Sequence, residues 1–328
     1  MRGFFLFAGG IAIATPALAN DSVASTGAGG LVLQPTADID MASEDLFVSA
    51  DQIKIHYVFR NHSPRDVTTI VAFPMPDRDL TNELESNIAF PSNFHTLVAG
   101  EPVKTQLERK AVVKGKDYTA LLHRLGIPVA PETVNNATKA MDRLSLAQRT
   151  QLQSLGLARD DQWDDDGKGM KHHLVPLWTI RDKYWWTQRF PAGRDLVVDH
   201  RYQPGTGGSV ENQLALPELR HGQYTKQMMA LYCVDQSFMQ AVDRLARRQR
   251  TNSPGMPDQR IDYILTTGAN WRSPIASFRL VVDKGKPNNL VSFCETGVKK
   301  ISPTQYEVRH SNWTPKRDLH VLIIQPQH

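Results

Sequence analysis

Hydrophobic and polar residues alternate with a period of two along Leu46–Pro76. Every second residue from Ile53 to Phe59 is apolar or aromatic, and the residues between them include Lys54 and His56. After a turn-forming stretch rich in polar residues, the alternation resumes at Val67 and ends at Pro74. This pattern is typical of half-buried antiparallel strands. We therefore predict a β-hairpin here. Its solvent-exposed face contains no convincing functional site, so we expect the hairpin to have a structural role.

Similar strand patterns occur before residue 114 and after residue 174, and helical spacing occurs between and within these blocks. The predicted fold class is mainly β with helical insertions (α+β). It comprises two antiparallel β-sandwich-like halves, a helical insertion and one long helix. The predicted segments are a signal peptide at 1–19, a first β block at 20–114, a helical insertion with an acidic loop at 115–173, and C-terminal strands at 174–328 that include a long helix at 226–248.

Within the insertion, stop and start signals predict short helices. Gly126 ends a helix that begins at Thr119, and the spacing of Ser145 and Gln148 is that of a capping box. The segments 158–173 and 203–209 are polar or glycine-rich, and we expect loops there.

The first residues have the pattern of an export signal. Arg2 precedes an apolar run over Phe4–Thr15, and the small residues Ala17 and Ala19 form a cleavage motif. We predict cleavage after Ala19 and a periplasmic or secreted mature protein; an uncleaved membrane anchor is the alternative. No later apolar run is long enough for a transmembrane segment.

The formal charge of +4 and the pI near 9.0 are a mild basic excess. We expect no nucleic-acid partner. The basic cluster at 244–250 fits the C-terminal end of a helix, where the helix dipole favours cations; contact with an anionic envelope polymer or lipid is the alternative.

The chain contains two cysteines, Cys233 and Cys294. An even number in an exported protein favours a disulfide. Two buried free thiols are the alternative.

Local catalytic signatures are missing from the sequence, including the nucleophile elbow, the HExxH zinc motif and the Walker loop. We predict no cofactor. One enzymatic alternative remains, a hydrolase directed at the envelope or at glycans, whose acid and base come from separate loops. Its candidate carboxylates are Asp235 together with Glu83, Glu85, Glu132 or Asp164.

A metal site is a second candidate. Asp160, Asp164 and Asp166 are spaced two or four apart before Gly167, and calcium prefers carboxylate oxygens. The glutamate that would complete an EF-hand loop is missing, so a solvated acidic loop is the alternative. The adjacent His172 and His173 suggest a transition metal only if a loop turns both toward one ion.

The densest aromatic cluster is the third candidate, with the alternative that most of its members fill the core. Aromatic faces can stack on a sugar or an aromatic ligand. The residues of this predicted platform are Trp178, Tyr184, Trp185 and Trp186.

Short motifs in a fixed order resemble an exported bacterial family of unknown function, number 4424. They extend over nearly the whole mature chain and comprise Gly29-Gly-Leu-Val32, Asp38–Leu46, Val71–Asp77, Trp186–Gly193, His200–Pro204, Tyr232–Asp235 and Trp313–Leu319. The resemblance implies an exported bacterial protein without an assigned activity, and it transfers no catalytic residue.

The sequence thus favours an exported, non-catalytic binding or accessory protein of the bacterial cell envelope. Its partner would be an envelope protein or a glycan, and an exposed sheet edge could serve the accessory role. The ligand and the oligomeric state stay open.

Overall fold

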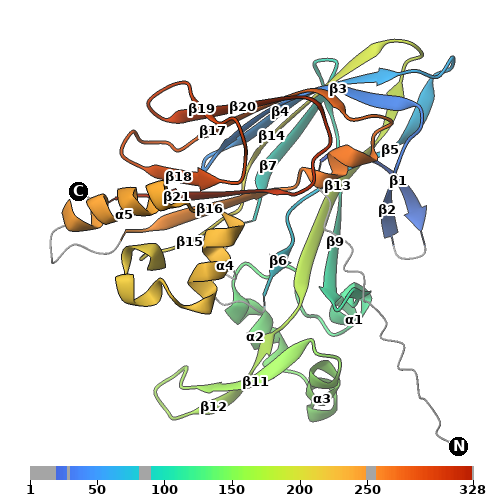
Figure 1. The fold of residues 1–328 in the computed structure, drawn as a ribbon. Coiled ribbons are helices and arrows are strands. Elements are labelled where there is room, and N and C mark those ends of the chain that lie inside the picture. The colour runs from blue at the N-terminus through green and yellow to red at the C-terminus, as the bar shows by residue number, and fades with distance from the viewer. Residues whose placement is uncertain (1–19, 28–29, 81–89, 249–255, 327–328) are drawn as a thin grey trace, which may run out of the picture.

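A computed structural model describes residues 20–27, 30–80, 90–248 and 256–326 (Figure 1). The predicted signal peptide lies outside these residues. The described chain is mainly β with helical insertions, so the predicted fold class is confirmed. No helix among the described residues has the length and apolar character needed to cross a bilayer.

The largest sheet has eight strands. All of its pairings are antiparallel except that between β3 and β17, which is parallel. In spatial order the strands are β19 (Lys299–Lys300), β20 (Gln305–Trp313), β17 (Ile275–Asp283), β3 (Ile39–Ser49), β4 (Ile53–Asn61), β14 (Asp195–Gln203), β7 (Ser92–Val98) and β8 (Glu101–Val103).

A seven-stranded sheet and two smaller sheets complete the β structure. The seven-stranded sheet has the order β10 (Lys116–Asp117), β9 (Gln106–Val113), β13 (Thr179–Phe190), β5 (Val67–Pro74), β1 (Ser22–Gly27) and β2 (Gly30–Gln34), with β6 (Arg78–Asp79) beside β13. The four-stranded sheet is β15 (Thr206–Ser209), β16 (Asp258–Tyr263), β21 (Leu319–Ile324) and β18 (Leu290–Phe293), and the two-stranded sheet is β11 (Ala158–Trp163) with β12 (Lys171–Pro176).

The strands β4 and β5 have the predicted alternation but not the predicted pairing. In β4 the residues from Ile53 to Phe59 alternate between buried and outward-facing positions, as the pattern requires. However, β4 pairs with β3 and β14, whereas β5 pairs with β1 and β13. The predicted hairpin is therefore wrong, because the intervening turn carries the chain from one sheet to the other.

One hydrophobic core unites the three larger sheets. Tyr57 and Phe59 of β4, Phe73 of β5 and Tyr263 of β16 belong to it, each at most 1% exposed. Both large sheets contain strands from before residue 114 together with strands from after residue 174. The two predicted halves are thus not separate sandwiches, because their apolar faces cover one another.

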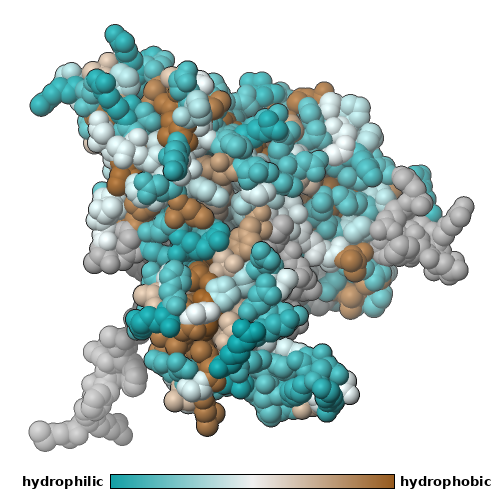
Figure 2. Space-filling view, turned by 180° about the vertical axis from the view of Figure 1, so that it is seen from behind, coloured by the Kyte–Doolittle hydropathy of each residue, from teal (hydrophilic) through white to brown (hydrophobic). Residues whose placement is uncertain are grey.

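The helical insertion forms a lobe with its own core. Its helices are α1 (Thr119–Arg124), α2 (Val134–Asp142) and α3 (Leu146–Ser154), and the capping box of Ser145 and Gln148 is confirmed. These helices lie with β11 and β12 at the end of β13 (Figure 1). Seen from behind, this lobe carries a strip of hydrophobic residues on an otherwise largely hydrophilic surface (Figure 2).

The long helix predicted at 226–248 is wrong. The structure has α4 (Gln223–Leu231) and α5 (Gln236–Arg248), separated by a break in which Cys233 has a positive φ of 51°. Asp235 accepts a hydrogen bond from the backbone N–H of Phe238 at 2.7 Å and so begins the second helix. The two helices cover a third core that includes Met228 and Val242.

Two segments expected to be loops contain strands. Residues 158–163 and 171–176 pair as β11 and β12, and only the acidic stretch between them is a turn. Residues 206–209 form β15 on the edge of the four-stranded sheet. The 3-10 helices are η1 (Gln213–Ala215), η2 (Pro217–Leu219) and η3 (Thr266–Asn270).

Candidate functional site

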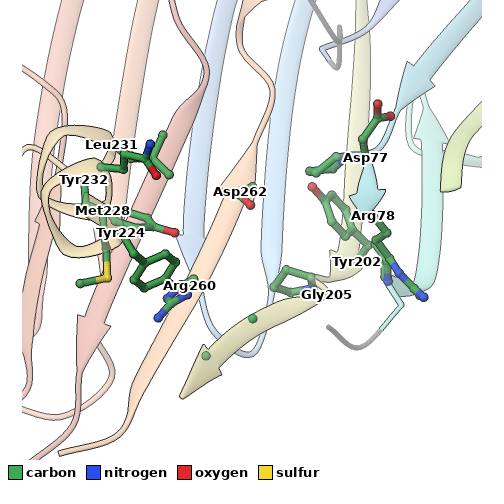
Figure 3. A pocket seen from close by; sticks show the side chains of 16 residues that line it. Asp77, Arg78, Tyr202, Gly205, Tyr224, Met228, Leu231, Tyr232, Arg260 and Asp262 are labelled. Carbon is green, nitrogen blue, oxygen red and sulfur yellow. Dashed lines mark hydrogen bonds between the residues drawn. The ribbon is translucent and has the colours of Figure 1, made fainter. Parts of the chain in front are cut away.

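A cavity of about 410 Å³ lies where α4, the ends of β14 to β16 and the segment after β5 meet (Figure 3). Its volume falls within the range of sites for small organic ligands. The lining residues are Pro76, Asp77, Arg78, Pro91, Tyr202, Pro204, Gly205, Gly207, Gly208, Tyr224, Gln227, Met228, Leu231, Tyr232, Arg260 and Asp262.

Aromatic and apolar side chains provide two walls of this cavity. Tyr224 and Met228 come from α4, Tyr232 follows that helix, and Tyr202 comes from β14 on the other side (Figure 3). Burial raises the pKa of Tyr202 and Tyr232 above the ordinary value. Both phenols are therefore neutral at physiological pH, and the walls offer ring faces and neutral hydroxyls.

The glycines of β15 allow this strand to approach β16 closely. A Cβ on Gly208 would lie 2.2 Å from the backbone oxygen of Asp258, which no side chain tolerates. A glycine is thus required at this position for steric reasons. The sequence pattern predicted a loop at 203–209 and did not reveal that a glycine is sterically required at position 208.

Two charged residues of β16 face the cavity, and each has a partner. Arg260 donates to the Tyr224 hydroxyl at 2.8 Å and lies 3.1 Å from the Asp258 carboxylate. Asp262 forms a 2.6 Å pair with His320 of the neighbouring strand β21. The hydrogen bonds hold these side chains in place before any ligand arrives.

The opposite side carries Asp77 and Arg78. Asp77 pairs with Arg181 at 2.6 Å. Arg78 is 7% exposed, its guanidinium lies 3.0 Å above the ring of Phe90, and its Nη1 is buried without a hydrogen-bond partner in the described part of the chain. Burial lowers the pKa of Arg78 to about 10, so the side chain stays cationic at neutral pH.

The carboxylate whose charge acts on Arg78 already has another partner. Asp182 raises the pKa of Arg78, but both of its oxygens accept hydrogen bonds from Arg109, at 2.7 and 2.6 Å. Arg78 is therefore a buried cation with an unsatisfied donor at the wall of a cavity. Such a group costs free energy unless an acceptor pairs with it.

A second, larger cavity of about 1180 Å³ lies over the outer face of the eight-stranded sheet. It is a broad groove lined by alternate residues of β4 such as Lys54 and His56, and His56 pairs with Asp199 at 2.7 Å. Its side chains are largely exposed, so it encloses a ligand less well than the first cavity does.

The four aromatic residues predicted as a platform do not share a surface. Trp178 is fully buried in the core of the lobe, and Trp186 is 3% exposed in the main core. Tyr184 stacks on Phe94 at 4.1 Å, and Trp185 packs against a small cluster around β1 and β2. A platform that includes Trp178 or Trp186 is wrong, because both rings fill the interior.

The predicted acidic site is rearranged in the structure. Asp164, Asp165 and Asp166 gather in the turn between β11 and β12 with carboxylate oxygens within 4.8 Å of one another, whereas Asp160 lies on β11 and contacts His172 at 2.5 Å. Asp164 accepts backbone hydrogen bonds from its own turn, including one from Gly167 at 2.6 Å. Metal binding here stays a prediction.

The histidine pair does not point to one ion. His172 is exposed, whereas His173 is buried and pairs with Asp142 of α2 at 2.7 Å. As neighbours on a strand, the two side chains lie on opposite faces.

The hydrolase candidates are dispersed. Asp235 is the exposed cap of α5, and its hydrogen bond from the backbone of Phe238 lowers its pKa. Glu132 is exposed near the start of α2, and Glu83 and Glu85 lie outside the described residues. Neither Asp235 nor Glu132 lines the cavity of Figure 3.

The predicted disulfide is confirmed. Cys233 and Cys294 are bonded, with their Cα atoms 5.1 Å apart. The bond ties the break between α4 and α5 to the segment after β18, next to Tyr232 in the cavity wall.

The residues of the cavity were missed because they come from distant parts of the chain. Arg78, Tyr202, Tyr224 and Arg260 have no common spacing, and only the glycine run was visible as an unusual feature.

Comparison with known proteins gives a family but no activity. No curated protein matches the chain. A solved structure from Legionella pneumophila, described as a "putative nutrient binding protein", is similar with 16% identity and a TM-score of 0.45, covering 92% of this chain and 72% of that one. The family model for a domain of unknown function, DUF4424, matches residues 19–322, and the chain therefore belongs to this family.

Proposed function

We propose that this protein is an exported, non-catalytic binding protein of the cell envelope, and that the cavity of Figure 3 takes a small organic molecule with an apolar or aromatic body and one anionic group. The observation that carries the proposal is Arg78, a buried cation at the cavity wall with a donor that no described residue pairs. A carboxylate or a phosphate oxygen would satisfy this donor.

The remaining lining supports the same ligand class. The phenol rings of Tyr202, Tyr224 and Tyr232 supply apolar contact area and hydroxyls that can orient a polar group. The other charged groups of the lining have partners among the described residues. Arg260 Nε, like Arg78 Nη1, is nevertheless buried there without a hydrogen bond, so the unsatisfied donors at the cavity both belong to cations.

The hydrolase alternative has less support at this cavity. Asp77 and Asp262 both line it, and each is held by a cationic side chain or a histidine. Glycoside hydrolysis needs two carboxyl groups available to act on the substrate, whereas Asp77 and Asp262 are both engaged with side chains of the protein.

Binding is tested by calorimetric titration of the purified protein with a panel of small aromatic and aliphatic carboxylates and phosphates, each matched by its uncharged amide or alcohol. We expect at least one acid to bind and its neutral analogue to bind at least about 10-fold more weakly, since a hydrogen bond to a charged group contributes about 1.5–3 kcal/mol.

Arg78→Met keeps the aliphatic stem and removes the charge. We expect it to lose the binding of the acid, whereas the matched variant Arg279→Met, which removes an arginine paired with Asp45 and Glu307 on the other sheet, keeps it. Equal affinity of Arg78→Met and the unchanged protein for the acid contradicts the proposal, as does a panel without any binder.

A further inference from the structure

The first described residues lie deep in the interior. Asn20, Asp21 and Ser22 are each 0% exposed. Strand β1 begins at Ser22 and pairs with β5, and the Ser22 hydroxyl accepts a hydrogen bond from the Asn270 side chain at 3.0 Å. The predicted cleavage point after Ala19 is thus adjacent to a segment built into the core.

Asn20 belongs to a buried polar cluster that also contains Glu44, Tyr57 and Tyr263. Its Nδ2 donates to Glu44 Oε2 at 2.9 Å, and its Oδ1 accepts from the Tyr57 hydroxyl. The Tyr57 and Tyr263 hydroxyls are 3.0 Å apart, and Tyr263 donates to Glu44 Oε1 at 3.4 Å. The cluster joins β3 and β4 to β16 at the position of Asn20.

Asp21 faces a second buried group, His200 of β14. Its carboxylate lies 3.1 Å from His200 Nε2, and both side chains are fully buried. His200 Nδ1 contacts the Thr96 hydroxyl at 2.9 Å.

The acidic and basic groups in this region are unequal in number. Glu44 and Asp21 are two buried carboxyl groups, and His200 is the one basic group paired with either of them among the described residues. Burial raises the pKa of Glu44 to about 8 and also raises that of Asp21. Among the described residues no cation pairs with Glu44, and its pKa of about 8 keeps it largely neutral at pH 7. A cation placed beside it would favour the ionised carboxylate.

We propose that this region is a binding site for the chain's own N-terminal ammonium group. Hydrolysis of the Ala19–Asn20 peptide bond adds one water, leaving a carboxylate on the released signal peptide and an ammonium on Asn20. The α-nitrogen is four covalent bonds from Nδ2, hence within about 5 Å of it, and Nδ2 is 2.9 Å from Glu44. The new cation therefore forms within about 8 Å of the Glu44 carboxyl group, and in the proposed site the two groups pair.

The proposal rests on the predicted cleavage and not on the ligand cavity. Removal of the signal peptide is therefore expected to stabilise the fold. Only the processed chain has an α-ammonium group on Asn20 that can pair with Glu44, where β1, β3 and β16 meet.

For the first test, the protein is expressed with its own signal peptide and is purified from the periplasm after processing. Intact mass should place the mature start at Asn20. Reductive dimethylation at pH 7.5, followed by peptide mapping, should leave the α-amine of Asn20 unmodified in the native protein and modify it in urea. Equal modification in both states, or a mature chain that starts elsewhere, overturns the proposal.

The second test compares the chain that starts at Asn20 with one that carries an additional Gly-Ser in front of it. We expect the extension to lower the melting temperature by at least about 4 °C and to have a much smaller effect in a Glu44→Gln background. Asp51→Asn, an exposed carboxylate of the β3–β4 turn, is the control and should leave the effect of the extension intact. An extension that does not change the melting temperature overturns the proposal; if Glu44→Gln does not fold, the dimethylation result decides.

Discussion

Trp178 shows how a residue that resembles a ligand platform can instead hold a fold together. Its ring is fully buried, and its indole N–H donates to the Val129 carbonyl at 2.8 Å. Val129 lies between α1 and α2, so this hydrogen bond fixes the connection of the two helices to the start of β13.

We expect Trp178→Phe to destabilise the protein by about 1–3 kcal/mol, since it removes ring volume and leaves a buried carbonyl unsatisfied. Urea unfolding followed by circular dichroism measures the change. The matched variant Trp185→Phe, at a partly exposed position, should lose less than about 1 kcal/mol. A stability of Trp178→Phe equal to that of the unchanged protein would contradict this role.

At the residue scale, the sequence predicted which side chains are buried better than it predicted what they do. Period-two alternation identified Ile53, Tyr57 and Phe59 as one buried face, as observed. It could not identify His200 or Glu44 as buried, because their burial depends on partners far along the chain. The burial of Arg78 could not be predicted from the sequence for the same reason.

At the scale of elements, the break between α4 and α5 matters most. Apolar residues continue at helical spacing through the break, so periodicity alone predicted one helix. The local chemistry around Cys233 and Asp235 overrides it: a positive φ at Cys233 ends the first helix, and Asp235 caps the second. The break places Tyr232 in the wall of the cavity.

We expect Asp235→Ala to lower stability by about 1 kcal/mol through loss of the helix cap. Thermal unfolding with the exposed variant Gln240→Ala as control measures this change. Binding of an acid at the cavity should be nearly unchanged, since Asp235 does not line it. A complete loss of an enzymatic activity in Asp235→Ala, with stability preserved, would instead support the hydrolase alternative.

Strands were also predicted better than their pairing. The alternation identifies the two faces of β4 and β5 but not the strands that pair with their edges. The same side-chain pattern is compatible with different neighbouring strands, because pairing uses backbone hydrogen bonds. The short strand β15 was missed because all four of its residues are small or polar and two of them are glycines.

At the scale of the whole molecule, the disulfide and the cavity are coupled. Cys233 follows Tyr232 directly, and Cys294 anchors it to the segment after β18. The bond closes a segment with a sequence separation of 61 residues, for which chain entropy gives a stabilisation of about 4 kcal/mol.

We expect the double variant Cys233→Ser, Cys294→Ser to lose about 2–4 kcal/mol of unfolding free energy and to bind an acid at the cavity more weakly. Chemical denaturation and calorimetry test the two effects, and a reductant should change the unaltered protein but not the variant. Unchanged stability in the variant would show that the bond does not restrain the fold.

The parallel pairing of β3 with β17 sets the order in which the molecule can assemble. It divides the eight-stranded sheet into two antiparallel groups, and it joins residues such as Asp45 and Arg279, which are 234 positions apart and form an ion pair at 3.0 Å. Until β17 has emerged, the inner edge of β3 has no partner, and an unpaired edge invites aggregation. A chain that is synthesised N-terminus first therefore leaves this edge of β3 unpaired until most of the molecule has been made.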